Sequence, residues 1–379
     1  MSLLTTMQNI LSPVLTPISK GYSAVMKRRA AGYENGRHER FEPLCPCISV
    51  GNIGSGGSGK TPLADWLLKW AEAEGMRAVL LTRGYGATPL SLPYLVKADS
   101  PVTEAGDEPL MLADANPAAR VVVDPVRKRS GKWATDEFNP DLMLLDDGFQ
   151  HMAVRRDLDF VLMTPDDFTT GWNKVIPRGT WRESKAALAR ADVFFVKSAP
   201  ADFNLMRELV EQKLRKFRKP VFQFELKAMG LKLLGGSKRL EFGSDEYLLF
   251  AGIGSPALLL NDACIYMGRK PAGFMEFKDH HAYSAQDVEH IRNRASAVKA
   301  KKIICTPKDA VKLNALGCDD FYVIDLELVF TESIFFEEND LKFFRAGNSG
   351  RCGFDKWWTK EILEEAFGKK SDLINCVNK

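Results

Sequence analysis

Residues 50–62 read VGNIGSGGSGKTP, and residues 54–61 of this stretch match the spacing G-x-x-x-x-G-K-[ST]. An apolar run precedes the stretch, and the spacing of Trp66, Leu67 and Trp70 after it is typical of an amphipathic helix. Such a strand–loop–helix unit binds phosphate, because glycines let backbone N–H groups turn toward phosphate oxygens and the helix N-terminus adds a partial positive charge. We therefore predict a phosphate loop with the ligands Gly54, Ser55, Gly56, Gly57, Ser58, Gly59, Lys60 and Thr61.

The lysine and the threonine of this loop distinguish between two kinds of nucleotide site. In a triphosphate site Lys60 contacts the β- and γ-phosphates, and the Thr61 hydroxyl binds Mg²⁺. Residues 54–59 also fit the dinucleotide pattern G-x-G-x-x-G, but that site needs an acidic residue at the end of the next strand, where this chain has Thr82 and Arg83. We predict a nucleoside triphosphate, and ATP because the chain lacks the Asn-Lys-x-Asp segment of guanine sites.

Short apolar runs alternate with helical patterns over residues 45–200, which indicates βαβ units and a mostly parallel sheet. The expected strands are 47–53, 77–82, 120–124, 141–146, 159–163 and 192–197, and the expected helices between them are 60–74, 107–115 and 183–190. Residues 220–243 resemble a pair of short strands, and a second α/β set runs from 247–254 to 320–326. We predict an α/β fold with an N-terminal segment (1–40), a P-loop NTPase-like domain (41–217), a two-stranded linker (218–245) and a smaller second α/β domain (246–379).

Two carboxylates follow the apolar run at 142–145. Asp146 and Asp147 stand where a Walker B strand places the carboxylate that holds Mg²⁺ directly or through water. The alternative is a turn with an N-capping aspartate. The pattern does not distinguish the metal ligand from its neighbour.

Two further polar clusters lie at expected helix starts. Asp107 and Glu108 stand between Gly106 and Pro109, and the residues alone favour a helix cap. Residues 279–281, Asp-His-His, fit either a weak metal site or an Asp–His pair that acts as a general base.

Composition excludes several classes of protein. The chain has 379 residues, of which 45% are hydrophobic and 27% charged, as in a globular protein. A net charge of +3 argues against a nucleic-acid-binding surface over the whole chain. Seven cysteines without a CxxC pair favour reduced thiols in a cytosolic compartment. No run of 18 apolar residues is present, so we expect no membrane-spanning helix.

The first thirty residues contain basic but no acidic side chains, and their apolar residues recur at spacings of three and four. This pattern predicts amphipathic helix, interrupted or started at Pro13 and Pro17. The charges follow the apolar residues instead of preceding them, which argues against a signal peptide. Association with an anionic membrane and docking on the chain's own domain both fit the pattern.

With these motifs in place, the chain resembles the tetraacyldisaccharide 4′-kinase family of lipid A biosynthesis over about residues 12–312. The motifs that carry the resemblance are VGNIGSGGSGKTP (50–62), TRGYG (82–86), GDEP (106–109), VVVDPVR (121–127), LDDGFQH (145–151), FAGIGSP (250–256), DHHAYS (279–284) and TPKDAVKL (306–313).

The resemblance implies a P-loop kinase of two α/β domains that transfers the γ-phosphoryl of ATP to the 4′-hydroxyl of an acylated glucosamine disaccharide 1-phosphate and so forms lipid IVA. It also implies a peripheral position on the cytoplasmic face of the bacterial inner membrane, with the N-terminal helix on the anionic membrane surface. Neither a nucleic acid nor a protein partner is expected.

The resemblance assigns roles to residues of the motifs. Asp107 is implied as the base, paired with His280, and Lys60 as a catalytic cation. The residues implied around Mg²⁺ and the nucleotide are Thr61, Asp146, Asp147, Glu108, Tyr85, Arg127, Gln150, His151 and Arg182.

Three parts of the chain depart from the family pattern. The family sequence Gly-Pro-Leu-Arg-Glu is Gly-Thr-Trp-Arg-Glu at residues 179–183, and Ser255 replaces the usual asparagine. The tail after about residue 327 matches poorly; we expect it to pack on the first domain, with a lipid-contacting surface as the alternative. A P-loop ATPase switch and a non-catalytic scaffold are the competing functions, and neither requires Asp107 together with His280.

Overall fold

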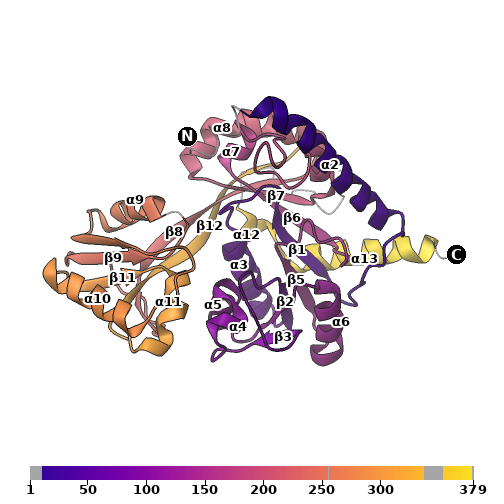
Figure 1. Ribbon diagram of the computed structural model, residues 1–379. Helices are drawn as coiled ribbons and strands as arrows, with labels where there is room; N and C mark the ends of the chain where they lie inside the picture. The colour runs from indigo at the N-terminus through magenta and orange to yellow at the C-terminus, as the bar shows by residue number, and fades with distance from the viewer. Residues whose placement is uncertain (1–10, 255, 337–352, 378–379) are drawn as a thin grey trace.

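The computed structural model describes residues 11–254, 256–336 and 353–377 and contains a sheet of twelve strands in the order β10-β9-β11-β12-β8-β7-β6-β1-β5-β2-β4-β3 (Figure 1). The strands are β1 (Cys47–Asn52), β2 (Ala78–Thr82), β3 (Tyr94–Val96), β4 (Arg120–Val123), β5 (Leu142–Asp146), β6 (Leu158–Met163), β7 (Val193–Lys197), β8 (Val221–Leu233), β9 (Tyr247–Ala251), β10 (Gly273–Glu276), β11 (Lys302–Cys305) and β12 (Tyr322–Ile334).

The helices lie on both sides of this sheet. They are α2 (Ser12–Glu34), α3 (Lys60–Ala73), α4 (Val102–Ala105), α5 (Asp107–Ala115), α6 (Arg127–Phe138), α7 (Pro165–Phe168), α8 (Pro200–Leu214), α9 (Pro256–Met267), α10 (Ala285–Ala297), α11 (Pro307–Leu313), α12 (Phe354–Trp357) and α13 (Lys360–Val377), with 3-10 turns at Lys185–Arg190, Arg215–Phe217 and Asn314–Leu316. We call β1–β7 with α2–α8, α12 and α13 the first lobe, and β9–β11 with α9–α11 the second lobe.

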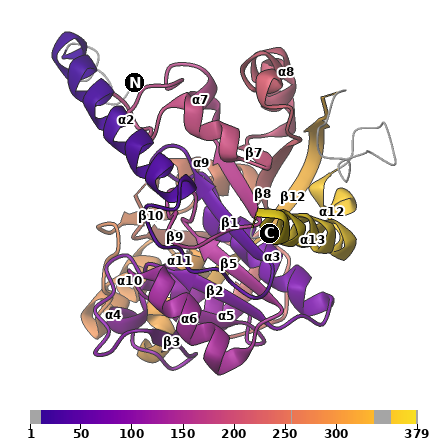
Figure 2. The same ribbon diagram turned by 90° about the vertical axis from the view of Figure 1, so that its right-hand side faces the viewer.

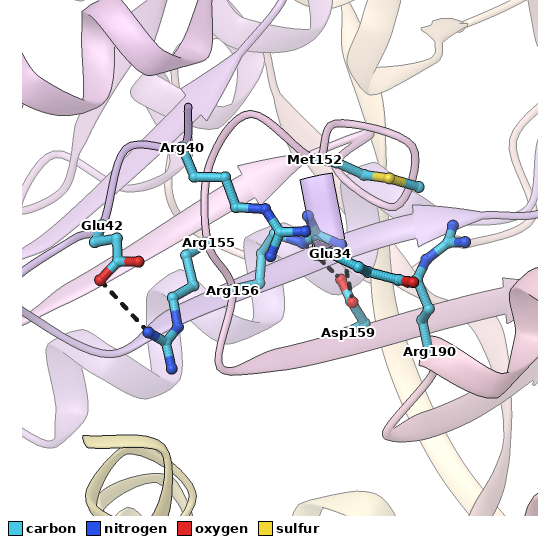
Figure 3. Close-up of a pocket in the computed structure, with 8 residues that line it drawn as sticks. All are labelled: Glu34, Arg40, Glu42, Met152, Arg155, Arg156, Asp159 and Arg190. Atoms are coloured by element: carbon cyan, nitrogen blue, oxygen red, sulfur yellow. Dashed lines mark hydrogen bonds and ion pairs between the residues drawn. The ribbon is translucent and has the colours of Figure 1, made fainter. Parts of the chain in front are cut away.

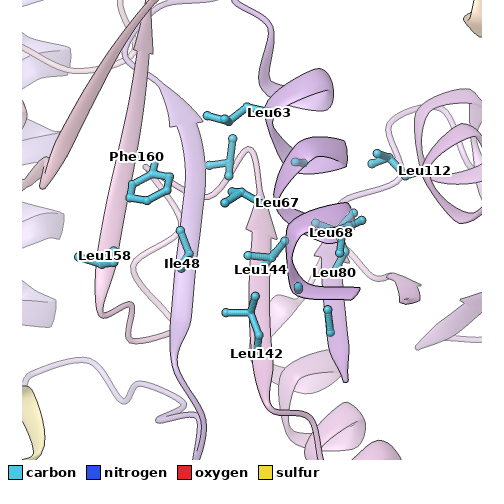
Figure 4. Packing of buried hydrophobic residues seen from close by; sticks show 14 of the residues in the cluster. Ile48, Leu63, Leu67, Leu68, Leu80, Leu112, Leu142, Leu144, Leu158 and Phe160 are labelled. Carbon is cyan, nitrogen blue, oxygen red and sulfur yellow. The ribbon is translucent and has the colours of Figure 1, made fainter. Parts of the chain in front are cut away.

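The predicted mostly parallel α/β sheet is confirmed. β1 lies between β5 and β6, and the three strands run parallel. All residues of these strands are buried, and α3 packs Leu63 and Leu67 against Ile48, Leu144 and Phe160 (Figure 4). Because parallel strands end at the same edge of a sheet, the phosphate loop after β1 and the acidic pair after β5 are neighbours.

The two lobes are joined by β8 and β12, which pair antiparallel along most of their length. The prediction of a hairpin within 220–243 was wrong in its pairing, since residues 221–233 form one long strand and only Leu231 bridges to Leu240. The partner strand lies about ninety residues further along the chain, and no local pattern indicates it. The predicted two-stranded connection therefore exists, but its second strand is β12.

The C-terminal segment returns to the first lobe. Phe354 and Trp358 are almost fully buried and pack with Trp66 and Trp70 of α3 and with Phe160 of β6. The boundary at 246–379 grouped this tail with the second domain, but the expectation that the tail packs on the first domain agrees with the described residues, whose aromatic side chains belong to the core of the first lobe. Burial of several large aromatic side chains explains why the tail packs here.

The helix α2 lies diagonally across the first lobe (Figure 2). Ser19 donates a hydrogen bond to the Val175 carbonyl at 2.9 Å, while Val14, Ile18 and Val25 are exposed. The predicted apolar residues before Leu11 lie outside the described part of the chain. Within that part, no helix combines the length and the apolar character that crossing a membrane requires.

Candidate active site

The phosphate loop leaves β1 at Asn52 and enters α3 at Lys60. Gly59 has a φ of 90°, a left-handed conformation that glycine adopts without strain. A Cβ atom at Gly59 would lie 2.8 Å from the Phe224 ring, so the fold also excludes a side chain there. No atom lies within 4 Å of a Cβ built at Gly56, and this side of the loop is open to a ligand.

Residues 180–182 support the loop from outside. The Ser55 N–H donates to the Thr180 carbonyl at 2.9 Å, and the Arg182 N–H donates to the Ile53 carbonyl at 2.8 Å. Trp181, which replaces the family leucine, is fully buried between these bonds. The segment that departs from the family pattern therefore contacts the phosphate loop through its backbone and buries its tryptophan.

The two adjacent aspartates have different partners. Asp147 has a φ of 48°, and its carboxylate lies 3.6 Å from Lys60 Nζ and 2.7 Å from Arg182. Asp146 Oδ2 accepts a hydrogen bond from Thr82 at 3.0 Å, while its Oδ1 is buried without a partner. Burial, Glu108 and Asp147 raise the pKa of Asp146 to about 6. Asp147 is satisfied by cations of the protein, and Asp146 presents a buried oxygen that lacks one.

Further predicted residues surround this pair. Thr61 donates a hydrogen bond to Glu108 at 3.1 Å. Arg127 is buried and donates to the Asp146 carbonyl at 2.9 Å, and its burial lowers its pKa. Gln150 donates to the Asn52 carbonyl at 2.9 Å and so contacts the beginning of the phosphate loop. These contacts place Thr61, Glu108, Arg127 and Gln150 in one site.

Tyr85 and His151 occupy opposite environments. Tyr85 is 82% exposed, and its ring centroid lies 6.1 Å from that of His280. His151 is largely buried, and its Nε2 has no partner. Burial, Arg127 and Arg156 lower the pKa of His151 to about 4. No contact between His151 and the phosphate loop is present among the described residues, so its predicted nucleotide contact stays a prediction.

Asp107 and His280 meet where the two lobes contact each other. His280 Nδ1 lies 3.0 Å from Asp107 Oδ2, and His280 Nε2 lies 3.3 Å from Lys308 Nζ. An ammonium group can only donate, so Nε2 accepts from Lys308 and the ring proton on Nδ1 is donated to Asp107. Asp107 opens α5 directly before Glu108, which contacts Thr61, and the Asp–His pair therefore adjoins the phosphate loop.

The sequence reasoning missed two lysines of this region. Lys197 ends β7 and donates to the Gly57 carbonyl of the phosphate loop at 3.4 Å. Lys312, within the motif at 306–313, lies 3.7 Å from Asp107 Oδ2. Lys197 could have been found from its position at the carboxyl end of a buried strand. Lys312 could not, because its contact with Asp107 depends on how the two lobes meet.

Other candidate regions lack these features. In the described chain no three His, Cys, Asp or Glu residues are grouped to hold a metal, and His281 Nε2 lies 3.3 Å from Asp287 Oδ2. A cavity of about 380 Å³ lies near the beginning of β6, at the edge of the sheet opposite the phosphate loop (Figure 3). It is lined by paired charges such as Arg156 with Asp159, and no predicted site residue lines it.

Comparison with known proteins identifies the family. The family model described as tetraacyldisaccharide-1-P 4′-kinase (LpxK) matches residues 11–340. A tetraacyldisaccharide 4′-kinase of Nitratidesulfovibrio vulgaris is 46% identical over 329 residues, which are 86% of this chain and 92% of the relative. A second such protein, of Oleidesulfovibrio alaskensis, is 42% identical over 93% of this chain and 96% of the relative.

A solved structure agrees with this family. The crystal structure of the "apo" form of LpxK from Aquifex aeolicus in complex with ATP has a TM-score of 0.67 and 26% sequence identity, and the match covers 86% of this chain and 95% of that chain. The fold, the family model and the relatives agree over most of the length of each protein. The chain belongs to the tetraacyldisaccharide-1-P 4′-kinase family.

Proposed function

We propose that this protein transfers the γ-phosphoryl group of ATP to the 4′-hydroxyl of a tetraacyldisaccharide 1-phosphate and so forms lipid IVA in lipid A biosynthesis. Family membership supports the reaction and the acceptor. The observation that carries the proposal is the 3.0 Å contact between Asp107 and His280, which come from different lobes and adjoin the phosphate loop. A P-loop switch or a scaffold has no need of such a pair.

The Asp107 carboxylate acts as the general base. A sugar hydroxyl is a poor nucleophile, and a positioned base contributes about 10²- to 10⁴-fold to the rate. His280 holds Oδ2 through its Nδ1–H group, and among the described residues no hydrogen bond to Oδ1 is present. The hydroxyl proton passes to Asp107 as the sugar oxygen bonds to the γ-phosphorus, the bond from that phosphorus to the bridging oxygen breaks, and ADP leaves.

Cations around the loop stabilise the transferred group. Phosphoryl transfer spreads negative charge over three equatorial oxygens, and fixed positive charges stabilise it. Lys60 and Arg182 belong to the phosphate loop and the segment that supports it, and Asp147 sets the positions of both. Arg127 is fixed by the Asp146 carbonyl. Their ion pairs and hydrogen bonds hold them in place before the nucleotide binds.

The residues present fit a bound Mg²⁺. The buried Oδ1 of Asp146 lacks a partner, and the Thr61 hydroxyl donates to Glu108, whose charge acts on Asp146. Mg²⁺ is usually held by one or two carboxylates together with phosphates and waters, so a cluster of three acidic residues is not required. Asp146 and Thr61 would hold the ion, and Mg²⁺ would neutralise charge on the β- and γ-phosphate oxygens.

The exposed residues of helix α2 support the proposal that the protein lies peripherally on the cytoplasmic face of the inner membrane. Val14, Ile18 and Val25 follow one face at spacings of four and seven and are more than half exposed. Basic residues such as Lys20 and Lys27 lie on the same helix, and an anionic lipid surface attracts them. The acylated acceptor is itself a membrane lipid, which gives the helix a reason to lie there.

The kinase assay tests the reaction and the base together. The purified protein is incubated with labelled ATP and a panel of acylated disaccharides, with and without Mg²⁺. We expect label only on disaccharides with a free 4′-hydroxyl, and only with Mg²⁺ present. Substitution Asp107→Ala should lower kcat by at least about a hundredfold, because the hydroxyl loses its base, while ATP still binds.

A variant of the same helix is the matched control. Asp114 is exposed near the end of α5, and Asp114→Ala should retain normal turnover. An Asp107→Ala enzyme with near-normal phosphorylation of the lipid would refute the base assignment. Phosphate release without labelled disaccharide would instead indicate a P-loop ATPase.

A further inference from the structure

The lysine of α11 that the proposed mechanism does not use is buried against the base. The Lys312 side chain is 3% exposed, and its Nζ lies 3.1 Å from Asp309 Oδ1 and 3.7 Å from Asp107 Oδ2. Asp309 belongs to the second lobe, and Asp107 belongs to the first. A single ammonium group therefore contacts a carboxylate from each lobe where α11 packs against α5 (Figure 1).

The position of this ammonium is set within the second lobe. Asp309 is fully buried; its Oδ1 accepts from the Tyr283 hydroxyl at 3.0 Å and the Gly252 N–H at 3.1 Å, and its Oδ2 accepts from Thr306 at 2.7 Å. Lys312 also lies over the Tyr283 ring, 5.3 Å from its centroid. A buried charge is costly unless it is paired, so this network keeps Lys312 at the interface.

The contacts on Asp107 determine which of its oxygens is available to the acceptor. Lys312 and His280 both approach Oδ2, and both come from the second lobe. These two contacts hold Oδ2 and so fix the orientation of the carboxylate. The ammonium also offsets the repulsion between Asp107 and Asp309, which would otherwise oppose contact between the lobes.

We infer that Lys312 is a positioning residue for the Asp107–His280 pair, which fixes the Asp107 carboxylate when the second lobe contacts α5. This inference rests on the proposed function, since it assigns Lys312 a role through the base. It differs from a role as simple structural support for α11, because support would not depend on the charge at Asp107. The two roles can be separated by testing Lys312 with and without that charge.

Kinetics of Lys312→Met provide the first test. Methionine keeps most of the volume and removes the charge, and we expect kcat to fall at least about tenfold while the Kd for ATP changes less than about twofold, because the substitution misplaces the base and leaves the phosphate loop intact. In the Asp107→Asn background, Lys312→Met should lower kcat less than about twofold, because the carboxylate that Lys312 positions is absent.

The matched control is another lysine of the second lobe. Lys302 has a side chain that is 14% exposed and donates to the Phe242 carbonyl at 2.8 Å, away from Asp107. We expect Lys302→Met to leave kcat within about twofold of the original. The inference would be overturned if Lys312→Met lowered kcat by the same factor in both backgrounds. A normal kcat in the single variant Lys312→Met would overturn it too.

Thermal unfolding supplies a readout that does not need activity. Lys312→Met leaves Asp107 buried without its cation, and neutralising that carboxylate in the double variant with Asp107→Asn should recover part of the lost Tm. Lys302→Met should lower Tm equally in both backgrounds. If Lys312→Met lowered Tm equally in the original and the Asp107→Asn backgrounds, Lys312 and Asp107 would not be coupled, and the inference would be overturned.

The two proposals fail in different ways. An Asp107→Asn enzyme with normal turnover would refute the base and with it the proposed mechanism. An inactive Asp107→Asn enzyme beside a normal Lys312→Met enzyme would refute only the role of Lys312.

Discussion

Asp146 and Asp147 are neighbours in the sequence, but the protein treats their charges in opposite ways. Burial and the charges of Glu108 and Asp147 raise the pKa of Asp146 to about 6. Burial would also raise the pKa of Asp147, but Lys60 and Arg182 outweigh it and lower that pKa. The sequence did not distinguish the two, and their partners favour Asp146 as the candidate metal ligand.

This contrast predicts opposite effects on stability. Between about pH 4 and pH 6 the folded protein keeps a proton on Asp146 that the unfolded chain has lost, so stability falls as the pH rises through this range. In metal-free protein at pH 7.5, Asp146→Asn should therefore raise the free energy of unfolding by roughly 2 to 3 kcal/mol. Denaturant unfolding of both proteins in EDTA, from pH 4 to pH 7.5, measures the free energy of unfolding. The difference between Asp146→Asn and the original protein should disappear toward pH 4.

Asp147→Asn is the matched control and should have the opposite sign. Its lowered pKa means that the ionised carboxylate stabilises the fold at neutral pH, and that this contribution is lost as the pH falls. The substitution also leaves Lys60 and Arg182 without their partner. Equal changes in both variants would contradict the assignment of different environments to the two carboxylates.

At the residue scale, the sequence predicted which residue types form the site better than it predicted which residues contact one another. The phosphate loop and the acidic pair follow single strands, and parallel strands bring their ends together without further information. Lys312 could not be found in this way, because its contact with Asp107 joins residues that are about two hundred positions apart and lie in different lobes. For His151 the motif predicted a nucleotide contact, and this stays a prediction; burial and nearby arginines lower the pKa of its ring to about 4.

At the scale of elements, most helices and strands follow local patterns. The second α/β set contains α10, where Ser284 caps the N-terminus and accepts from the Asp287 N–H. The pairing of β8 with β12 has no such local signal. A strand of thirteen residues replaces the expected hairpin because its apolar residues pair with a distant strand of similar length.

The exposed face of α2 leads to a prediction at this scale. The triple variant Val14→Ser, Ile18→Ser and Val25→Ser removes large apolar side chains that are 53–65% exposed, so the folded protein should keep its Tm. Partition into anionic vesicles should fall at least about tenfold, because each buried apolar side chain contributes on the order of 1 kcal/mol. Sedimentation with liposomes measures this.

Leu205 provides the control for this experiment. It is 87% exposed on α8, and Leu205→Ser changes a similar side chain outside α2. Vesicle binding should be unchanged in this variant. If the triple variant sedimented with anionic vesicles as well as the original protein, α2 would not be the anchor.

At the scale of the whole molecule, the chain leaves the first lobe through β8 and returns to it through β12. The aromatic residues after β12 then complete the core around α3, with Trp358 packed on Trp70. The first lobe is therefore built from both ends of the sequence, and the second lobe is inserted between them. A boundary drawn once along the chain, as at 218–245, cannot describe such an arrangement.

This insertion predicts that the second lobe can be removed without unfolding the first. Leu233 and Tyr322 are opposite each other in the β8–β12 ladder, so an Asn-Gly turn can replace residues 234–321 and close a hairpin. The shortened protein should unfold cooperatively and bind ATP within about tenfold of the full chain, because the phosphate loop and its supports remain. It should show no kinase activity, since His280 and Lys312 are gone.

A fragment that ends at residue 233 is the informative comparison, because it retains β8 but lacks β12 and the aromatic tail. Without them Phe195, Phe222 and Trp70 lose packing partners such as Phe354 and Trp358, and removal of a large buried aromatic costs about 3 to 5 kcal/mol. Since a domain is stable by only about 5 to 15 kcal/mol, this fragment should not fold. Near-UV circular dichroism distinguishes the two proteins, and a well-folded fragment 1–233 would contradict the return of the chain as the element that completes the first lobe.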